Sequence, residues 1–125
     1  MEVEALGREA IAFQADVCDA DHCKAMVAAT KERFGALHVA FLNAGIGVHR
    51  PEFEIRLDEW DTTMNVDLRG VLIGLQAMGR AILDSGGGSV VITSSGAGIC
   101  GEPNIGSYAA AEHGVLGLMK CAAVE

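Results

Sequence analysis

Three short runs of apolar and β-branched residues alternate along the chain with longer stretches of helical pattern. The runs cover Ala10 to Ala15, Leu37 to Leu42 and Ser89 to Thr93. Short strands that alternate with helices are typical of a parallel sheet, because each parallel connection must cross back over the sheet. The sequence therefore predicts an α/β fold, a partial Rossmann-like doubly wound parallel sheet with helices on both faces.

Helix signals fill the stretches between these strands. Asp19 can cap a helix that ends at Phe34, and Asp58 can cap a second helix. The second helix carries one apolar stripe, whose members recur at spacings of four and three: Met64, Leu68, Val71, Leu75, Met78 and Ile82. A last helix is expected from about Ile105 to the end of the chain. Because residues 1–6 also look like the tail of a helix, we expect residues 1–125 to be a single, partial domain.

Composition and charge restrict the class of partner. Half of the 125 residues are apolar, which is enough for one domain with a core. The 9 basic and 17 acidic residues give a net charge of -8, the wrong sign for a protein that binds nucleic acid. The longest apolar run, Ala36 to Val48, is shorter than the roughly 20 residues that a membrane span needs. The four cysteines form no Cys-x-x-Cys pair, so we expect a cytoplasmic protein with reduced thiols and no metal site.

A glycine motif after the third expected strand needs separate consideration. Gly96-Ala97-Gly98-Ile99-Cys100-Gly101 matches the Gly-x-Gly-x-x-Gly pattern of dinucleotide-binding folds. That pattern requires a helix to begin inside the glycine run, so that its amides meet the pyrophosphate. Here Pro103 follows and biases Glu102 away from helix. The sequence therefore predicts a loop that lines a site rather than a phosphate cradle.

A tyrosine and an upstream serine are candidates for proton-transfer chemistry. Tyr108 follows Ser95 by thirteen positions and opens an alanine-rich helical run. A phenol ionises near pH 10 in water, so it exchanges protons at neutral pH only when a cation lies beside it. Position 112 lies about 40° around the helix from Tyr108 and one turn along. Glu112 occupies it, and a carboxylate disfavours the phenolate instead.

Tyr-x-x-x-Lys after an upstream Ser is the signature of the short-chain dehydrogenase/reductase family, and about residues 5–125 resemble the central part of such an enzyme. The resemblance makes Ser95 the residue that orients the substrate oxygen and Tyr108 the catalytic acid/base, next to the cofactor. It also makes Asp16-Val17 the adenine-contacting step and Asn43-Ala44-Gly45 the turn beneath the cofactor. It implies NAD or NADP as cofactor, an alcohol or ketone as substrate, and a homo-oligomer for the complete protein.

The sequence departs from this family pattern at three points. Glu112 occupies the lysine position, and Asp67 stands where the family commonly has an Asn that organises a proton-relay water. Asp67 falls about 60° from the centre of the apolar stripe, which predicts a site position rather than a solvated one. The glycine-rich phosphate turn has no counterpart before Asp16. We therefore expect the isolated chain to bind neither NADH nor NADPH appreciably.

Three interpretations remain open at this point. The first is part of an NAD(P)-dependent oxidoreductase that interconverts an alcohol and a ketone. The second is a non-catalytic pseudo-enzyme or oligomerisation partner on the same scaffold, in which Glu112 would be harmless. The third is a flavodoxin-like binding or receiver domain, which fits the alternation of elements but explains none of the ordered motifs.

Overall fold

The computed structural model of this protein describes residues 2–125. Its two strands are β1 (Val39–Leu42) and β2 (Ser89–Ile92). The helices are α1 (Glu2–Ala5), α2 (Ala20–Phe34), α3 (Leu57–Thr63), α4 (Gly70–Gly74), α5 (Arg80–Asp84) and α6 (Gly106–Val124). Between them lie two short 3-10 turns, η1 (Glu52–Glu54) and η4 (Gly96–Gly98), and two π-helical segments, η2 (Met64–Arg69) and η3 (Leu75–Gly79).

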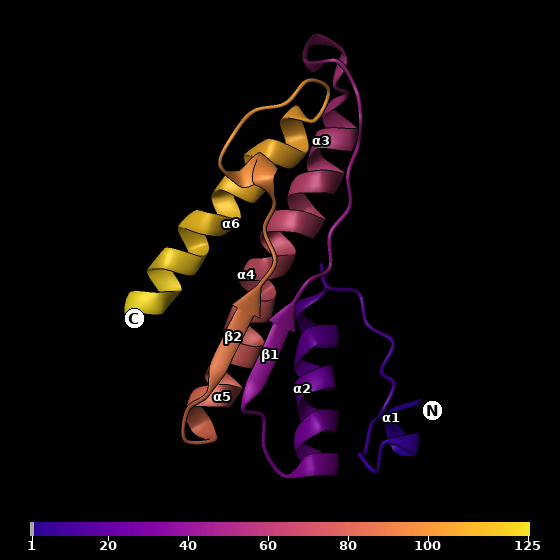
Figure 1. Ribbon diagram of the computed structural model, residues 1–125, viewed down its shortest axis with the longest axis vertical. Helices are drawn as coiled ribbons and strands as arrows, with labels where there is room; N and C mark the ends of the chain where they lie inside the picture. The colour runs from indigo at the N-terminus through magenta and orange to yellow at the C-terminus, as the bar shows by residue number, and fades with distance from the viewer. Residues whose placement is uncertain (1) are drawn as a thin grey trace.

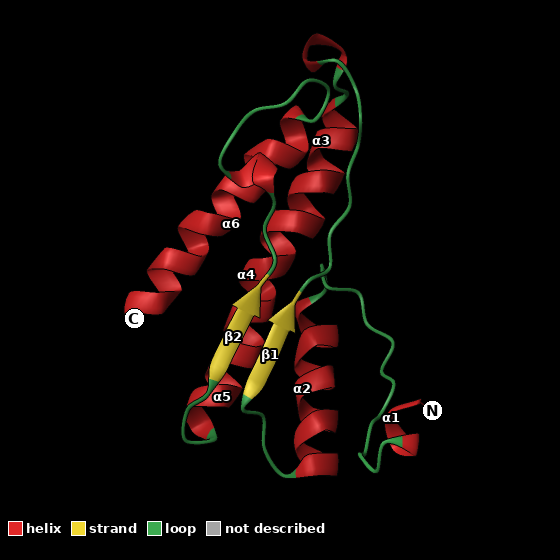
Figure 2. Ribbon diagram, viewed as in Figure 1, coloured by secondary structure: helices red, strands yellow, loops and turns green. Residues whose placement is uncertain are grey.

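The two strands form a parallel pair, in register from Val39 opposite Ser89 to Leu42 opposite Ile92 (Figure 2). Along β1, Ala40 is buried and Leu42 is half-buried, whereas the alternate residues Val39 and Phe41 are exposed. This period of two is what a strand shows when helices cover one of its faces. The structure thus confirms the α/β class and the parallel sheet.

The strand expected over Ala10 to Ala15 is absent, so this prediction was wrong. The segment is a loop that runs beside α2 (Figure 1), and an ion pair of 3.0 Å between Glu9 and Arg33 links its start to that helix. A strand exists only when a neighbouring strand takes up its hydrogen bonds. The usual strand order of this architecture, 3-2-1-4-5-6, places two further strands between such a segment and β1.

Helix α2 follows its sequence signals closely. The Asp19 side chain accepts hydrogen bonds from the amides of Asp21 and His22, which makes it the N-cap. At the other end Gly35 adopts a positive φ of 84°, and its amide donates to the carbonyl oxygen of Lys31. Both predicted ends of the helix are therefore confirmed.

The second helix starts earlier than Asp58, so the prediction of Asp58 as N-cap was wrong. Arg56 is the residue that precedes the helix, and its amide donates to the Glu59 carboxylate at 3.3 Å. The Asp58 carboxylate instead binds the Arg56 guanidinium within the first turn, with two contacts of 2.9 Å. Glu59 satisfies the terminal amide, so Asp58 is not needed as a cap.

The segments α3, η2, α4, η3 and α5 follow one another without a break, and we call residues 57–84 the long helix (Figure 1). Val71 and Ile82 of the predicted stripe are buried, and the other four members are half-buried. A small residue outside the stripe also lies against β1. A Cβ on Gly74 would lie 2.8 Å from Leu42 Cδ2, so any larger residue there would require the Leu42 side chain to move.

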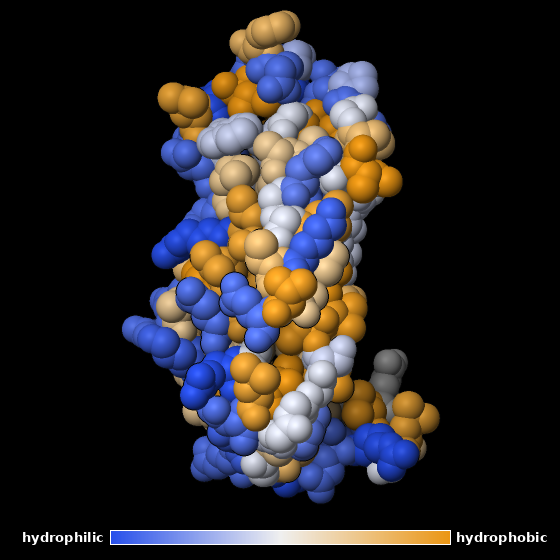
Figure 3. Space-filling model, turned by 90° about the vertical axis from the view of Figure 1, so that its left-hand side faces the viewer, coloured by the Kyte–Doolittle hydropathy of each residue, from blue (hydrophilic) through white to orange (hydrophobic). Residues whose placement is uncertain are grey.

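Helix α6 packs against η2 of the long helix and against η4. Ser107, Ala111, Glu112 and Val115 are its buried residues, while its last residues, from Met119 onward, are exposed. Apolar side chains also reach the surface, and on the face shown in Figure 3 they form patches between charged groups. Among the described residues, none of the helices has the length and hydropathy of a membrane-spanning segment.

Candidate active site

A cavity of about 510 Å³ lies where the loops after β1 and β2 meet the start of α6. Its walls are formed by Asn43, Gly45, Ile46, Gly47, His49, Ser95, Ala97, Glu102, Ile105 and Tyr108. Both strands point their carboxyl ends toward these loops (Figure 2), which is where open α/β sheets bind their ligands. The cavity also has the volume of a small-molecule site.

Ser95 and Tyr108 both line this cavity, so the structure brings the two predicted residues together. Ser95 precedes the η4 turn, and its hydroxyl oxygen accepts a hydrogen bond of 3.2 Å from the Ala97 amide. Tyr108 lies in the first turn of α6 and is half-buried. The neighbouring Ser94 is turned toward α6, where its hydroxyl donates to the Glu112 carbonyl oxygen at 3.4 Å.

The segment Asn43-Ala44-Gly45 follows β1 and contributes two residues to the cavity wall. Asn43 Oδ1 accepts a hydrogen bond of 2.7 Å from the Thr93 hydroxyl, which ties the ends of the two strands together. A Cβ on Gly45 would lie 3.5 Å from Asp67 Oδ1, so the turn sits directly on the long helix. Ala44 is exposed and does not line the cavity.

Asp67 lies behind this wall and is only 2% exposed, which confirms that it is not a solvated surface acid. Its Oδ1 accepts a hydrogen bond of 2.8 Å from the Ile46 amide and so holds the cavity loop. Burial raises the pKa of Asp67. The hydrogen bond from Ile46 lowers this pKa in part, and the negative charge of Glu112 raises it further.

Glu112 is also buried, with 6% of its surface exposed, although it does not line the cavity. Its negative charge raises the pKa of Asp67, as the smallest of the three causes that act there. The side-chain atom Oε2 has no hydrogen-bond partner in the described chain. That Glu112 disfavours the phenolate of Tyr108 stays a prediction from the sequence.

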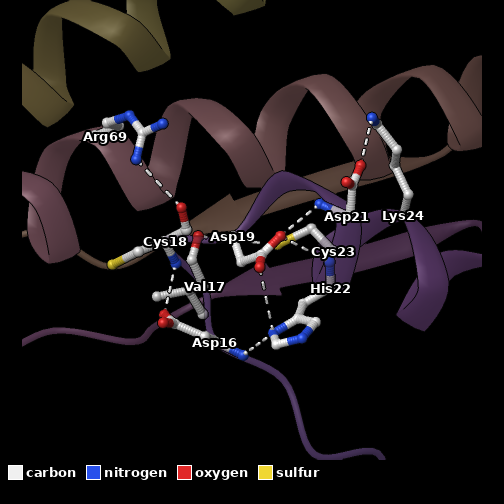
Figure 4. A network of polar contacts seen from close by, with 9 residues as sticks. All are labelled: Asp16, Val17, Cys18, Asp19, Asp21, His22, Cys23, Lys24 and Arg69. Carbon is white, nitrogen blue, oxygen red and sulfur yellow. Dashed lines mark hydrogen bonds and ion pairs between the residues drawn. The ribbon is translucent and has the colours of Figure 1, made fainter.

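Asp16 and Val17 do not line this cavity, and they form a turn just before α2 (Figure 4). Asp16 Oδ1 accepts a hydrogen bond of 2.8 Å from the Cys18 amide, and the Asp16 amide donates to His22 Nδ1 at 3.2 Å. Arg69 of the long helix donates to the Cys18 carbonyl oxygen at 3.2 Å. The turn is therefore fastened to both helices.

Of the two thiols near this turn, Cys23 is buried and Cys18 is half-buried. Cys18 donates to the Asn65 carbonyl oxygen at 3.6 Å, and Cys23 donates to the Val17 carbonyl oxygen at 3.9 Å. Burial is the main cause that raises the pKa of both thiols. Among the residues that the structure describes, no three His, Cys, Asp or Glu side chains cluster as metal ligands.

Several wall residues were not predicted from the sequence, namely Ile46, Gly47, His49, Glu102 and Ile105. The signal that could have found them is their position in the two loops that directly follow the strands. The loop over Gly96 to Gly101 does border the cavity, as predicted. It contains only a short 3-10 turn, and α6 begins later, at Gly106, so no helix starts inside the glycine run.

Known proteins resemble this chain throughout its length. Residues 1–125 match the family model described as short chain dehydrogenase. Cyclohexanol dehydrogenase from Acinetobacter sp. (strain SE19) is 42% identical over 125 residues, which cover 99% of this chain and 50% of that protein. Levodione reductase from Leifsonia aquatica is 42% identical over 118 residues, which cover 94% of this chain and 44% of that protein.

Solved structures agree with this result. Carveol dehydrogenase from Mycobacterium avium, solved in complex with NAD, is 38% identical with a TM-score of 0.93; the match covers 97% of this chain and 44% of that one. The structure of levodione reductase is 43% identical with a TM-score of 0.84, covering 88% and 43%. The chain spans about half the length of the curated relatives it matches.

Proposed function

Since this chain belongs to the short-chain dehydrogenase family, we propose that it is the central part of an NAD(P)-dependent oxidoreductase that interconverts an alcohol and a ketone. The observation that carries the proposal is the cavity at the carboxyl ends of the strands, which Ser95 and Tyr108 line together. The names of the relatives, cyclohexanol dehydrogenase and levodione reductase, support a cyclic secondary alcohol or ketone as substrate.

The residues of the cavity suit this reaction. The Ser95 hydroxyl would orient the substrate oxygen by a hydrogen bond, and the Tyr108 hydroxyl would exchange the proton with that oxygen. Gly45 and Gly47 form part of the same wall, next to Asn43. Asn43 and Gly45 would hold the nicotinamide end of the cofactor, and Asp16 and Val17 the adenine end. When bound, the nicotinamide supplies or takes up the hydride.

Glu112 supports a second candidate function, a non-catalytic member of the family that serves in subunit association. The position next to Tyr108 on α6 holds a buried carboxylate where the family signature has a cation. An apolar groove between the long helix and α6 offers a surface for a second subunit, and its walls include Met64, Leu68, Leu72 and Leu118. The two candidates differ in what the substitution of Glu112 should do.

The test is a comparison of Glu112→Lys with Asp67→Asn in a full-length protein that carries this segment. General acid-base catalysis is worth roughly 10²- to 10⁴-fold, and only Glu112→Lys supplies the missing cation. We therefore expect that variant to raise kcat for cyclohexanol with NAD⁺ or NADP⁺ by roughly 10²-fold, with a much smaller effect of Asp67→Asn. Glu125→Lys is the matched control, because it changes the charge equally at an exposed residue just after α6.

Three outcomes discriminate between the candidates. A large gain in Glu112→Lys alone supports an oxidoreductase limited by its missing cation. Strong activity in the unmodified protein, or equal gains in both variants, means that Glu112 is not the limiting defect. No activity in any variant, with the fold intact by circular dichroism, favours the non-catalytic function.

A further inference from the structure

A histidine of α2 fixes the start of the turn at Asp16 and Val17. The Asp16 amide donates a hydrogen bond of 3.2 Å to His22 Nδ1, six residues further along the chain (Figure 4). A ring nitrogen that accepts a hydrogen bond carries no proton. The neutral His22 ring in this structure therefore has its proton on Nε2, and Nδ1 is the atom that binds the turn.

The same nitrogen has a second neighbour, which is a carboxylate. His22 Nδ1 lies 3.9 Å from Asp19 Oδ2, whereas the other carboxylate oxygen of Asp19 caps α2 (Figure 4). A protonated Nδ1 can only donate, so it would release the Asp16 amide and bind the Asp19 carboxylate. His22 thus has two possible partners, and one proton decides between them.

The charged groups next to His22 on α2 form an ion pair of their own. Lys24 binds Asp21 at 2.9 Å. Near the other end of the helix, Arg33 pairs at 3.0 Å with Glu9 of the preceding loop. Helix α2 also packs against α4 and η3, and neither segment contains a titratable residue.

The long helix presents one charged residue to this turn. The Arg69 guanidinium donates to the Cys18 carbonyl oxygen and to Asn65 Oδ1, so it is bound there. The thiols of Cys18 and Cys23 are uncharged at neutral pH, because burial raises their pKa values. Within the described chain, the group at ion-pair distance from the imidazole is therefore the Asp19 carboxylate.

The turn that His22 binds suits the edge of an adenine ring. The Asp16 carboxylate accepts hydrogen bonds, and within residues 2–125 no group of the chain accepts a hydrogen bond from the Val17 amide. Adenine presents an amino group that donates and ring nitrogens that accept. An acceptor and an unused donor in adjacent residues complement this edge, as long as the backbone of the turn keeps its shape.

We propose that His22 is a positioning residue for the adenine end of the cofactor. With Nδ1 unprotonated it fixes the Asp16 amide, and with Nδ1 protonated it binds Asp19 and leaves that amide to water, which reaches Asp16 because the residue is exposed. The inference rests on the proposed function, in which Asp16 and Val17 hold adenine. An imidazole in water takes up a proton near pH 6.5, so the turn is fixed at about pH 8 and released at about pH 5.5.

Calorimetric titration of ADP-ribose into the full-length protein that carries this segment tests the proposal. ADP-ribose contains the adenine but no nicotinamide, so the measurement does not depend on hydride transfer. We expect its Kd to rise about twofold to tenfold between about pH 8 and about pH 5.5, the range that one hydrogen bond is worth. Circular dichroism at both pH values checks that the fold is intact.

Three variants separate the role of the ring from that of the fold. His22→Gln keeps an oxygen that can accept from the Asp16 amide but cannot be protonated, so its Kd should not change with pH. His22→Leu has no acceptor and should bind ADP-ribose weakly at both pH values. His113→Gln is the matched control, because His113 is also exposed and contacts a backbone carbonyl oxygen, that of Ala109 on α6; it should behave like the unmodified protein.

Two further measurements examine the two partners of the ring. Nitrogen NMR of the unliganded protein with isotope-labelled histidine should show, at about pH 8, a ring protonated on Nε2 whose signal is missing in His22→Gln. Asp19→Asn keeps the cap, since asparagine caps helices as well as aspartate does, but removes the carboxylate. In this variant the loss of ADP-ribose affinity should occur at lower pH, because the protonated ring has lost its partner.

Several results would overturn the proposal. A Kd that does not change with pH, or a change that survives in His22→Gln, refutes the role of His22 while cofactor binding itself stands. A neutral His22 ring with its proton on Nδ1 refutes it as well, since such a ring cannot accept from the Asp16 amide. If the protein binds no ADP-ribose at about pH 8 although NMR shows the expected ring, the proposed function is wrong, and the role of His22 toward the cofactor is wrong with it.

Discussion

Replacing Gly98 with alanine tests how tightly the loop after β2 packs against α6. A Cβ at this position would lie 2.6 Å from Ser94 Oγ and 3.1 Å from the carbonyl oxygen of Glu112. The serine hydroxyl can rotate away, but the carbonyl belongs to the backbone of a helix and cannot move alone. Either the loop or α6 must shift, and both carry a residue of the cavity, Ser95 on one side and Tyr108 on the other.

The size of the effect follows from three contributions. Overpacking of a close contact costs about 1–3 kcal/mol. Loss of the hydrogen bond between Ser94 and the Glu112 carbonyl oxygen costs a further 0.5–1.5 kcal/mol or so. Alanine also lowers the conformational entropy of the unfolded chain, and this gain of about 0.4–1 kcal/mol offsets most of that loss. We expect Gly98→Ala to lower the free energy of unfolding by about 1–3 kcal/mol.

Gly96→Ala is the matched control, because it lies in the same turn and a Cβ there would meet nothing within 4 Å. It should leave stability unchanged or raise it by up to about 1 kcal/mol. Urea denaturation followed by circular dichroism measures both variants. With an m-value of about 1–3 kcal/mol/M, the midpoint for Gly98→Ala should fall by about 1 M relative to the control. Equal midpoints would refute the close packing inferred for this turn.

Two further predictions concern the exposure of the backbone and of the thiols. Amides of β1 and β2 should exchange with deuterium more slowly than those of Ala10 to Ala15, because the latter segment has no neighbouring strand. Slow exchange at Ala12 to Gln14 in a monodisperse monomer would mean that the chain completes a sheet of its own. Cys100 and Cys121 are exposed and should react with a maleimide at least about tenfold faster than Cys18 and Cys23, whose pKa values burial raises. Equal rates before unfolding in urea would contradict the burial of Cys23 and the partial burial of Cys18.

Local signals in the sequence predicted those parts of the fold that depend on local chemistry. Asp19 and Gly35 delimit α2 because a cap needs only its own side chain or its own backbone conformation. The run Ala10 to Ala15 has the composition of a strand but no neighbour to pair with, and composition cannot report the presence of a partner. Asp58 matches the preference for aspartate at helix starts, but here the Glu59 carboxylate bonds the terminal amide, that of Arg56.

The residues of the candidate site also fall into two groups, those that local sequence signals identify and those that depend on contacts between loops. Order and spacing identified Ser95, Tyr108 and Asn43, since each follows directly from a strand end or a helix start, and all three line the cavity. His49 and Glu102 were missed because they lie well inside irregular loops, whose paths depend on contacts such as the hydrogen bond from the Arg50 amide to the Asn104 carbonyl oxygen. The sequence contains no periodic signal for such contacts.

Asp67 and Glu112 show what is lost when departures from a family pattern are judged one at a time. From the sequence, Asp67 is an acid at the Asn position and Glu112 a carboxylate that disfavours the phenolate of Tyr108, and neither pattern links the two residues. In the structure the charge of Glu112 acts on Asp67, so a change at either position alters the charge that the other experiences. An ammonium introduced by Glu112→Lys would also interact with the Asp67 carboxylate, and this interaction would weaken its effect on the pKa of the Tyr108 phenol. The two substitutions therefore cannot be additive, and the cation at position 112 should act most strongly on the phenol when residue 67 is Asn, the residue that the family commonly has there.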